Sequence, residues 1–401
     1  MALLRATLTL LAGGAVAQAL PLLLGPMLTR LYTPGDFGVY HLFAAVAANV
    51  AVLACARYEF ALPLARSEGE AHALRVLCLR LLAAVGGIAA LGSFAWAMTL
   101  GAAWPLWLGP AVAALALVSL ATLWSTRAQQ FKRLATARVV QHGGGALAQA
   151  GAGVLGGGLT ALIVAPVAAA LAAAAVLRLP LAGALAASRH RLVAAARRHR
   201  EFPLLNTPHA FAGALQDTLS IALIAAWQGP AAAGFWGLAL RYLKAPATLV
   251  GGAVSQALYP RLAQARGAAE GRRQVRRVMA TLAAIAVPLM TLLWIGGPWL
   301  FERAFGPDWR EAGDLARALA LYIGLHFVAS PLAVATMAWN AQAWALKLAA
   351  VGQVVFIAAL AVGLWRGGLV GAGWSVSVAM ALYFGWYFWR LAWWPVSPEA
   401  A

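Results

Sequence analysis

The fold is decided by residues 206–256, which read NTPHAFAGALQDTLSIALIAAWQGPAAAGFWGLALRYLKAPATLVGGAVSQ. Two apolar runs, 206–228 and 232–256, lie on either side of Gly229 and Pro230. Each run is long enough for an α-helix to cross a bilayer core of about 30 Å. Polar side chains recur inside both runs at helical spacing, which is typical of membrane helices that face a cavity or another helix. The stretch therefore predicts a hairpin of two membrane-spanning helices.

The composition extends this interpretation to the whole chain. Of its 401 residues, 63% are apolar and only 10% are charged, and the mean hydropathy is +0.78. Charged residues make up roughly 25% of an ordinary soluble protein, so this chain cannot cover a soluble fold with polar surface. A cytosolic enzyme, a secreted disulfide scaffold and a disordered chain are excluded. We expect an all-α polytopic membrane protein.

Similar apolar runs recur along the chain and give about 12 expected transmembrane helices. They are rich in Leu and Ala and lack the ten-residue alternation of membrane strands. The expected spans are residues 6–29, 37–56, 74–99, 105–126, 135–156, 159–179, 206–228, 232–256, 278–300, 317–339, 343–364 and 369–391.

Basic residues are distributed unevenly among the loops. The chain has 30 Lys and Arg against 12 Asp and Glu, a formal net charge of +18. If the N-terminus is inside, most of the Lys and Arg fall on the cytoplasmic side, which is the bias that sets membrane orientation. We therefore expect both termini in the cytoplasm. Because loop orientation explains the positive charge, we expect no nucleic-acid partner.

The spans divide into two sets of six. The basic connector 187–203 separates an expected N-terminal lobe, 1–186, from an expected C-terminal lobe, 204–401. The second helix of each half opens with the same spacing, at Pro34, Gly38 and Tyr40 and at Pro230, Gly234 and Trp236. The matching helices hold the same position in each half, so the repeats run parallel. Parallel repeats predict two bundles with a binding site between them.

Charged side chains fall deep within the expected hairpin. Asp217 precedes its turn by about 12 residues, and Arg241 and Lys244 follow it by about 12 and 15, which places all three ~18–22 Å from the turn. One interpretation is a structural ion pair. The other is that the two cations bind an anionic substrate group, with Asp217 as counter-ion or proton acceptor. The surplus positive charge favours the second interpretation.

Other polar residues within the spans are further candidates for substrate contact, namely Gln18, Asn49, Asn206 and Gln216. Arg57 and Glu59 follow the second span at its inner end. They are candidates for a gate that binds substrate or a coupling ion, and interfacial snorkelling explains them equally well.

No pattern of catalytic or metal-binding residues stands out. The two cysteines, Cys55 and Cys78, have no CxxC spacing, and no cluster of His, Cys and carboxylates has metal-ligand spacing. No nucleophile and base pair is evident. We therefore expect no catalytic residue, no bound metal and no cofactor, with coupling to H⁺ or Na⁺ as the only ionic requirement.

Four loose motifs follow one another between residues 29 and 313. They are Thr29-Arg30-Leu31-Tyr32-Thr33-Pro34 with Phe37, Gly38 and Tyr40; Arg57-Tyr58-Glu59 with Ala61 and Pro63; Gly234-Phe235-Trp236 with Ala239, Arg241 and Pro246; and Phe305-Gly306 with Trp309 and Gly313. In these motifs and their order the chain resembles the oligosaccharide (O-antigen-type) flippases, polysaccharide transporters of the multidrug/oligosaccharidyl-lipid/polysaccharide exporter superfamily.

The resemblance implies two six-helix bundles that form a V-shaped central cavity. It implies a protein of the bacterial inner membrane that moves undecaprenyl-diphosphate-linked repeat units of O-antigen, capsule or exopolysaccharide to the outer leaflet by alternating access. The diphosphate would bind Arg241, Lys244 and Arg57. Asp217 and Glu59 would serve coupling or charge balance. We expect a monomer, with a polysaccharide polymerase or glycosyltransferases as candidate partners.

Two alternatives stay open. A multidrug cation antiporter of the same superfamily would need an acidic cavity, whereas the expected cavity is basic. A membrane polysaccharide polymerase or ligase generally needs a sizeable outer catalytic loop. The largest outer loop expected here, residues 302–317, is short and shows no constellation of catalytic carboxylates.

Overall fold

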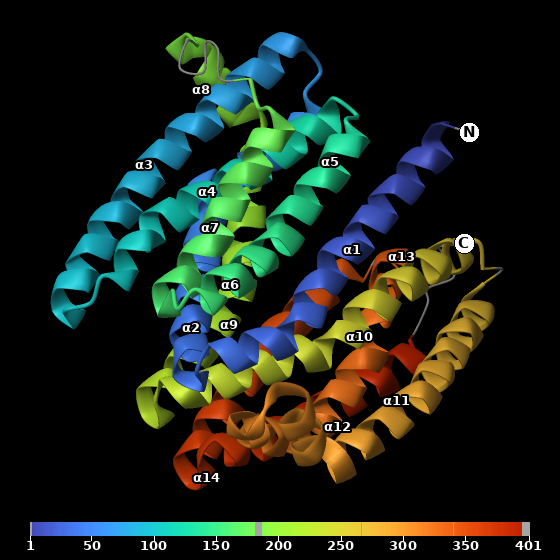
Figure 1. The fold of residues 1–401 in the computed structure, drawn as a ribbon. Helices are drawn as coiled ribbons and strands as arrows, with labels where there is room; N and C mark the ends of the chain where they lie inside the picture. The colour runs from blue at the N-terminus through green and yellow to red at the C-terminus, as the bar shows by residue number, and fades with distance from the viewer. Residues whose placement is uncertain (1, 181–186, 266, 340, 395–401) are drawn as a thin grey trace. The chain divides into compact units, whose positions relative to one another are not determined.

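The computed structural model describes residues 2–180, 187–265, 267–339 and 341–394 (Figure 1). In this part of the chain every regular element is helical and no strand occurs. Nine of the described helices are long and apolar enough to cross a membrane. The expected all-α polytopic membrane fold is therefore confirmed.

The expected spans that are not counted separately among these nine helices are also helical. α14 (Gln342–Ala392) consists of two helices joined at Gly367 and Gly368, whose backbone is not helical. α10 (Pro230–Ala263) carries Arg241 and Lys244, which lower its hydropathy. The expected span 135–156 is covered by α5 (Phe131–Arg138), the π-helix η3 (Val139–Gly144) and α6 (Gly145–Val154). With these segments the described chain has the twelve long helical stretches that the sequence predicts.

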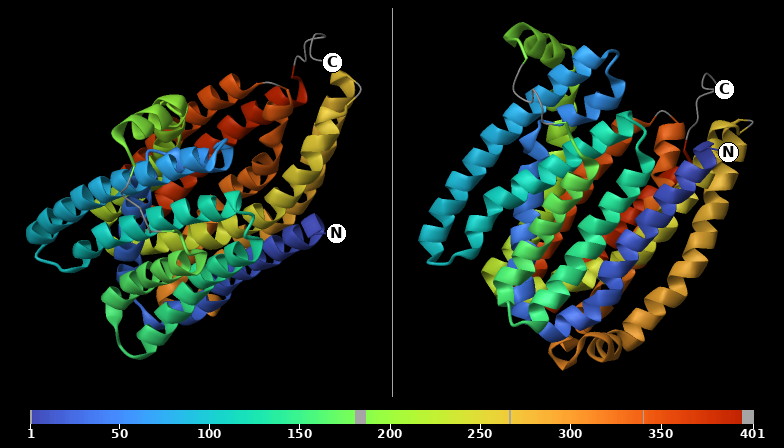
Figure 2. Two further views of the ribbon diagram at one scale, coloured as in Figure 1. Left: turned by 90° about the horizontal axis from the view of Figure 1, so that it is seen from above. Right: turned by 45° about the horizontal axis from the view of Figure 1, so that its top comes forward.

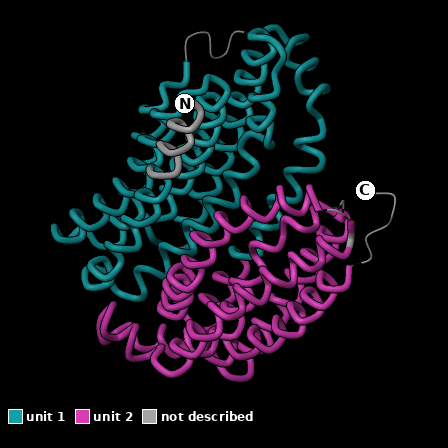
Figure 3. Tube along the Cα trace, turned by 90° about the vertical axis from the view of Figure 1, so that its right-hand side faces the viewer, with its two compact units in different colours: residues 1–218 teal, residues 219–401 magenta. Residues whose placement is uncertain are grey.

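Two compact units divide the chain, residues 1–218 and 219–401 (Figure 3). The division falls within α9 (Thr207–Gln228). Packing and internal repetition need not divide a chain at the same residue, so the expected lobes, 1–186 and 204–401, stay a prediction.

Unit 1 is built around three helices rich in small residues. Its long helices are α1 (Ala2–Leu31), α2 (Pro34–Ala54), α3 (Glu68–Leu100), α4 (Leu108–Arg127) and α7 (Gly158–Leu177). The short η1 (Tyr58–Leu64) lies between α2 and α3, η2 (Trp104–Trp107) between α3 and α4, and η4 (Phe202–Asn206) before α9. Ala114 and Ala121 on α4 and Ala173 on α7 are fully buried in the core that these helices form with α2. Small side chains let the helix backbones approach closely.

The first motif, residues 29–40, shapes the corner between α1 and α2. Thr33 caps α2 in a capping box, because its Oγ1 accepts from the Asp36 backbone N–H at 3.1 Å while Asp36 Oδ2 accepts from the Thr33 N–H. Pro34 occupies the first helical turn. Tyr32 donates its hydroxyl to the Gln149 carbonyl at 2.7 Å and so ties the corner to α6.

In unit 2, aromatic residues of the third and fourth motifs form the core. The unit contains α10, α11 (Ala268–Phe305), η5 (Pro307–Trp309), α12 (Arg310–Leu332), α13 (Val334–Ala338) and α14. Trp236 and Trp309 are each 1% exposed. Phe235 meets the Trp309 ring edge-on at 5.8 Å, and Trp236 meets Phe356 at 6.3 Å. The motifs therefore mark packing positions that hold α10, α12 and α14 together.

The basic connector contains a short surface helix. α8 (Arg189–Arg198) lies across the start of α3 in both views of Figure 2. Leu192 and Ala195 are buried on one side of α8, and its Arg residues lie on the exposed side. The described part of 187–203 therefore packs against unit 1 at the start of α3, in addition to its expected role as a connector.

Candidate functional site

The turn after α2 has an unusual backbone. Ala56 and Arg57 have φ of 47° and 61°, in the left-handed region, before the chain enters η1. This conformation costs a non-glycine residue about 1–2 kcal/mol. It persists where the surroundings fix it, and such positions are concentrated at functional sites. The turn directs Arg57 away from the helical path of α2.

Arg57 is joined to another predicted site residue. Its Nε donates to Asn206 Oδ1 at 3.0 Å, although 149 residues separate them, and its guanidinium lies 4.4 Å from the centre of the Phe60 ring. Asn206 is exposed and Arg57 is half-buried. Among the described residues the Nη atoms of Arg57 make no hydrogen bond, so its fork is available to an anionic ligand.

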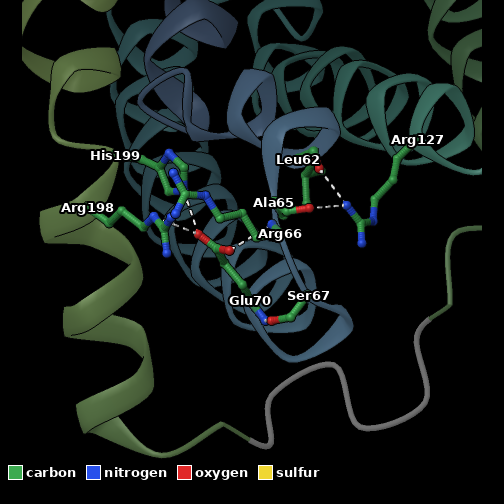
Figure 4. Close-up of polar contacts among 8 residues, drawn as sticks. All are labelled: Leu62, Ala65, Arg66, Ser67, Glu70, Arg127, Arg198 and His199. Carbon is green, nitrogen blue, oxygen red and sulfur yellow. Dashed lines mark hydrogen bonds and ion pairs between the residues drawn. The ribbon is translucent and has the colours of Figure 1, made fainter.

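The loop that carries Arg57 is held by α4. Arg127 Nη1 donates to the Ala65 carbonyl at 2.6 Å and to the Leu62 carbonyl at 3.5 Å, as Figure 4 shows. Its Nη2 pairs with Glu68 Oε1 at 2.7 Å. One partly buried guanidinium thus satisfies carbonyls at the end of η1 and a carboxylate at the start of α3.

A second polar cluster holds the same loop to the C-terminal end of α8. Glu70 Oε1 lies 2.9 Å from His199 Nε2 and 3.3 Å from Arg198 Nε, and Glu70 Oε2 accepts from the Arg66 backbone N–H at 2.8 Å (Figure 4). Tyr58 donates to the Ala196 carbonyl at 3.3 Å. The strained turn is therefore fixed from two sides.

Glu59 points into the protein beside this turn. It is 4% exposed. Burial raises the pKa of its carboxyl group above the usual range, although its own backbone N–H, the nearby Arg57 charge and Ser119 act in the opposite direction. The sequence left gating and interfacial snorkelling open for Glu59. The observed burial is not that of a snorkelling side chain.

The other candidates of unit 1 differ in exposure. Gln18 on α1 and Asp217 on α9 are exposed, and Gln216 is half-buried. Asn49 on α2 is 5% exposed, and its Nδ2 makes no hydrogen bond to any described residue. Arg57 and Asn206 are the two predicted substrate-contact residues that a described hydrogen bond joins directly.

Arg241 and Lys244 are both half-buried on α10 in unit 2, and their spacing places them on neighbouring parts of one helix face. Gly229, with φ of 87°, forms the turn before α10, as the sequence predicts. Asp217 belongs to unit 1, so its pairing with the two cations stays a prediction.

His326 on α12 is a polar residue of unit 2 that the sequence analysis missed. It lines a cavity of about 220 Å³ together with Ser330, Thr336 and Tyr383. The Tyr322 and Phe384 rings lie 5.9 and 6.3 Å from its ring. The one feature of the sequence that could have identified His326 as a candidate is that it is a single histidine in an apolar span.

A family model described as "Polysaccharide biosynthesis protein" matches residues 27–314. The chain belongs to this family. The matched range contains all four motifs, so the resemblance drawn from them is confirmed. No curated protein matches the chain by sequence.

Solved structures with a similar fold are transporters and a flippase. The lipid II flippase MurJ, in an inward closed conformation, aligns with a TM-score of 0.71 at 10% identity over 97% of this chain and 90% of its own. An inward-facing multidrug resistance transporter of the MATE family, in the MOP superfamily, gives 0.68 at 13% identity over 94% and 98%. A variant of the Vibrio cholerae MATE transporter VcmN gives 0.55 at 16% identity over 97% and 95%. At these identities the likeness establishes the fold.

Proposed function

We propose that this family member is a lipid-linked oligosaccharide flippase. It moves undecaprenyl-diphosphate-linked repeat units of O-antigen, capsule or exopolysaccharide from the inner to the outer leaflet of the bacterial inner membrane by alternating access. The observation that carries the proposal is the family match over residues 27–314, in a chain whose fold is shared by a lipid II flippase and by transporters.

The basic groups of the candidate site suit the diphosphate of such a substrate. A diphosphate is compact and highly charged, and a planar guanidinium binds phosphate oxygens with two parallel hydrogen bonds. Arg57 offers its Nη atoms for such bonds while Asn206 holds its Nε. We propose that Arg57 in unit 1, and Arg241 and Lys244 in unit 2, each contact the diphosphate during the cycle. Gln18, Asn49, Asn206 and Gln216 are proposed to contact the sugars.

The charge balance also supports this function over multidrug transport. Organic cations are stabilised by carboxylates, and the hairpin of α9 and α10 carries one acid, Asp217, against Arg241 and Lys244. A cation antiporter therefore has less support, although its fold is the same. Drug resistance conferred by overexpression would favour it instead.

The site assignment is tested by charge reversal on α10. Lys244→Glu places a carboxylate where the proposal needs a cation, so export of repeat units should be lost while membrane insertion is unchanged. Lys347→Glu, at an exposed position on α14, is the matched control and should export normally. Outer-leaflet repeat units are quantified in a deletion strain that expresses each variant at equal level. Normal export by Lys244→Glu would overturn the site assignment.

We further propose that Asp217 couples transport to H⁺ or Na⁺. Asp217→Asn removes the charge with little change in shape, so transport should lose its dependence on external pH or on Na⁺. Transport by Asp217→Asn that follows the wild-type dependence would remove Asp217 from the coupling step. This test leaves the substrate assignment untouched.

A further inference from the structure

Cys55, Glu59 and Cys78 form a buried cluster in unit 1. Cys55 caps the end of α2, Glu59 lies in η1 and Cys78 lies on α3. Their two Sγ atoms and a carboxylate oxygen all lie within 4.8 Å of one another. The three residues are 2%, 4% and 0% exposed. Because 23 positions separate the cysteines, their spacing favoured no metal site, and only the fold brings them together.

The Glu59 carboxylate gives an independent sign of a missing ligand. Its Oε2 is buried and makes no hydrogen bond to any residue that the structure describes. A buried polar atom without a partner costs about 1–3 kcal/mol, and such atoms are few in folded proteins. Cys55 Sγ donates only a weak bond, 3.7 Å long, to the Cys78 carbonyl. The proposed transport function gives Cys55 and Cys78 no role, and the coupling role expected for Glu59 does not supply a partner for its Oε2.

We propose that this cluster binds a thiophilic divalent cation of the Zn²⁺ class. Two thiolates and one carboxylate are ligands that Zn²⁺ accepts, and a water would complete its tetrahedral shell. Zn–S bonds of about 2.3 Å place two sulfur ligands about 3.8 Å apart. The observed limit of 4.8 Å therefore requires only a small inward rotation of the side chains.

The surroundings fit such a site electrostatically. Two thiolates and a carboxylate around a divalent cation leave one negative charge. Arg57 acts on Glu59 through its charge, which offsets part of this negative charge. A disulfide between the two cysteines would leave Glu59 Oε2 without a role, whereas the metal gives it one.

A bound cation would stabilise the local structure. It would join the end of α2 to α3 across the turn that carries Arg57, which is two residues after Cys55. Bound metal should therefore hold the left-handed turn in place and raise the thermal stability of the protein. This role is independent of which substrate the protein moves.

The experiment uses the full-length protein, purified in detergent and depleted of metal, with Co²⁺ as the spectroscopic probe. Wild type should bind about one equivalent with thiolate-to-cobalt charge-transfer absorption, which Zn²⁺ removes by competition. Cys55→Ser and Cys78→Ser should each lose most of that absorption. Glu59→Gln should keep it but bind at least about tenfold more weakly. Glu68→Gln, a nearby carboxylate whose side chain is 84% exposed, is the matched control and should bind as wild type does.

Absorption spectroscopy at the Zn edge on wild type tests the same site without any variant. Sulfur neighbours in the first shell support the proposal, and a shell of only nitrogen and oxygen overturns it. Absence of charge-transfer absorption in reduced wild type, or its full retention in both cysteine variants, also overturns it. So does a wild-type protein isolated with the mass of a Cys55–Cys78 disulfide. These readouts involve no transport, so failure here leaves the proposed flippase function standing.

Discussion

Arg57 has an unfavourable backbone conformation and carries the diphosphate-binding role that we propose. Its left-handed backbone is unfavourable, yet Arg127 and Glu70 hold the surrounding loop in place. The sequence predicted Arg57 and Asn206 as separate candidates in distant parts of the chain. Their contact at 3.0 Å could not be predicted, because it depends on how chain segments 149 residues apart pack. The contact also depends on the left-handed turn at Ala56 and Arg57. Residue preferences do not predict this turn, because neither alanine nor arginine favours a left-handed backbone.

Arg57→Gly separates stability from function at this turn. Glycine adopts the left-handed conformation without strain, which offsets the lost contacts with Asn206 and Phe60. The free energy of unfolding should stay within about 1 kcal/mol of wild type, whereas export should fall at least tenfold. Thermal unfolding in detergent and the leaflet assay measure the two effects. Arg66→Gly, an exposed position in the same loop, is the control for export. Normal export by Arg57→Gly would contradict the proposed role.

Arg127 should matter for stability. Arg127→Ala removes the guanidinium that donates to the Ala65 carbonyl and pairs with Glu68, while the Leu62 carbonyl keeps the Ala65 N–H as a donor; the free energy of unfolding should fall by about 2 kcal/mol. Arg127→Lys should recover only part of this loss, because an ammonium group lacks the planar fork. Lys132→Ala removes an exposed cation from the neighbouring α5 and should change the melting temperature little. A melting temperature of Arg127→Ala equal to wild type would contradict this interpretation of the loop.

The helices themselves were predictable because hydropathy determines them. Each expected span coincides with a helical stretch, and Pro34 and Pro230 stand in the first turns of α2 and α10, as their motifs suggest. The two halves differ further along the chain. Pro63 lies in the 3₁₀-helix η1, whereas Pro260 lies inside the continuous α10. The π-helical turns at Val139–Gly144 and Phe202–Asn206 were not predicted either, since tertiary packing at those positions decides them.

Close packing between the two parts of α14 gives a test at Gly363. A Cβ there would lie 2.5 Å from the Ala372 Cα and 2.6 Å from the Gly371 carbonyl oxygen, which are backbone atoms and cannot rotate away. Gly363→Ala should therefore lower the free energy of unfolding by about 1–3 kcal/mol. Gly385→Ala meets open space and should be neutral or slightly stabilising. Thermal unfolding in detergent measures both effects. If Gly363→Ala and Gly385→Ala had equal melting temperatures, the two parts of α14 would not pack closely at Gly363.

For the whole chain, the sequence establishes the membrane class, and the family match and the fold confirm it. The orientation in the membrane and the choice of substrate depend on other features of the chain. Charge bias predicts orientation because basic loops are retained in the cytoplasm. Substrate choice depends on which side chains the folded chain brings together, which no local pattern encodes. For the same reason, the sequence did not predict the buried cluster of Cys55, Glu59 and Cys78, which only the fold brings together.

The expected orientation places the C-terminus and residues 187–203 in the cytoplasm and residues 302–317 outside. A green fluorescent protein fused to the C-terminus should fluoresce, because that reporter matures only in the cytoplasm. Alkaline phosphatase inserted within 302–317 should be active, and the same insertion within 187–203 should be inactive. The opposite pattern would reverse the inner and outer assignments of every loop.

The most direct test of the central claim is the leaflet distribution of undecaprenyl-diphosphate-linked repeat units in a deletion strain, read by mass spectrometry of extracted lipids with and without an impermeant label. The proposed function predicts complete repeat units that accumulate facing the cytoplasm. Wild type, but not Lys244→Glu, should return them to the outer leaflet. Repeat units that accumulate facing outward in the deletion strain would contradict it, because flipping would then proceed without this protein.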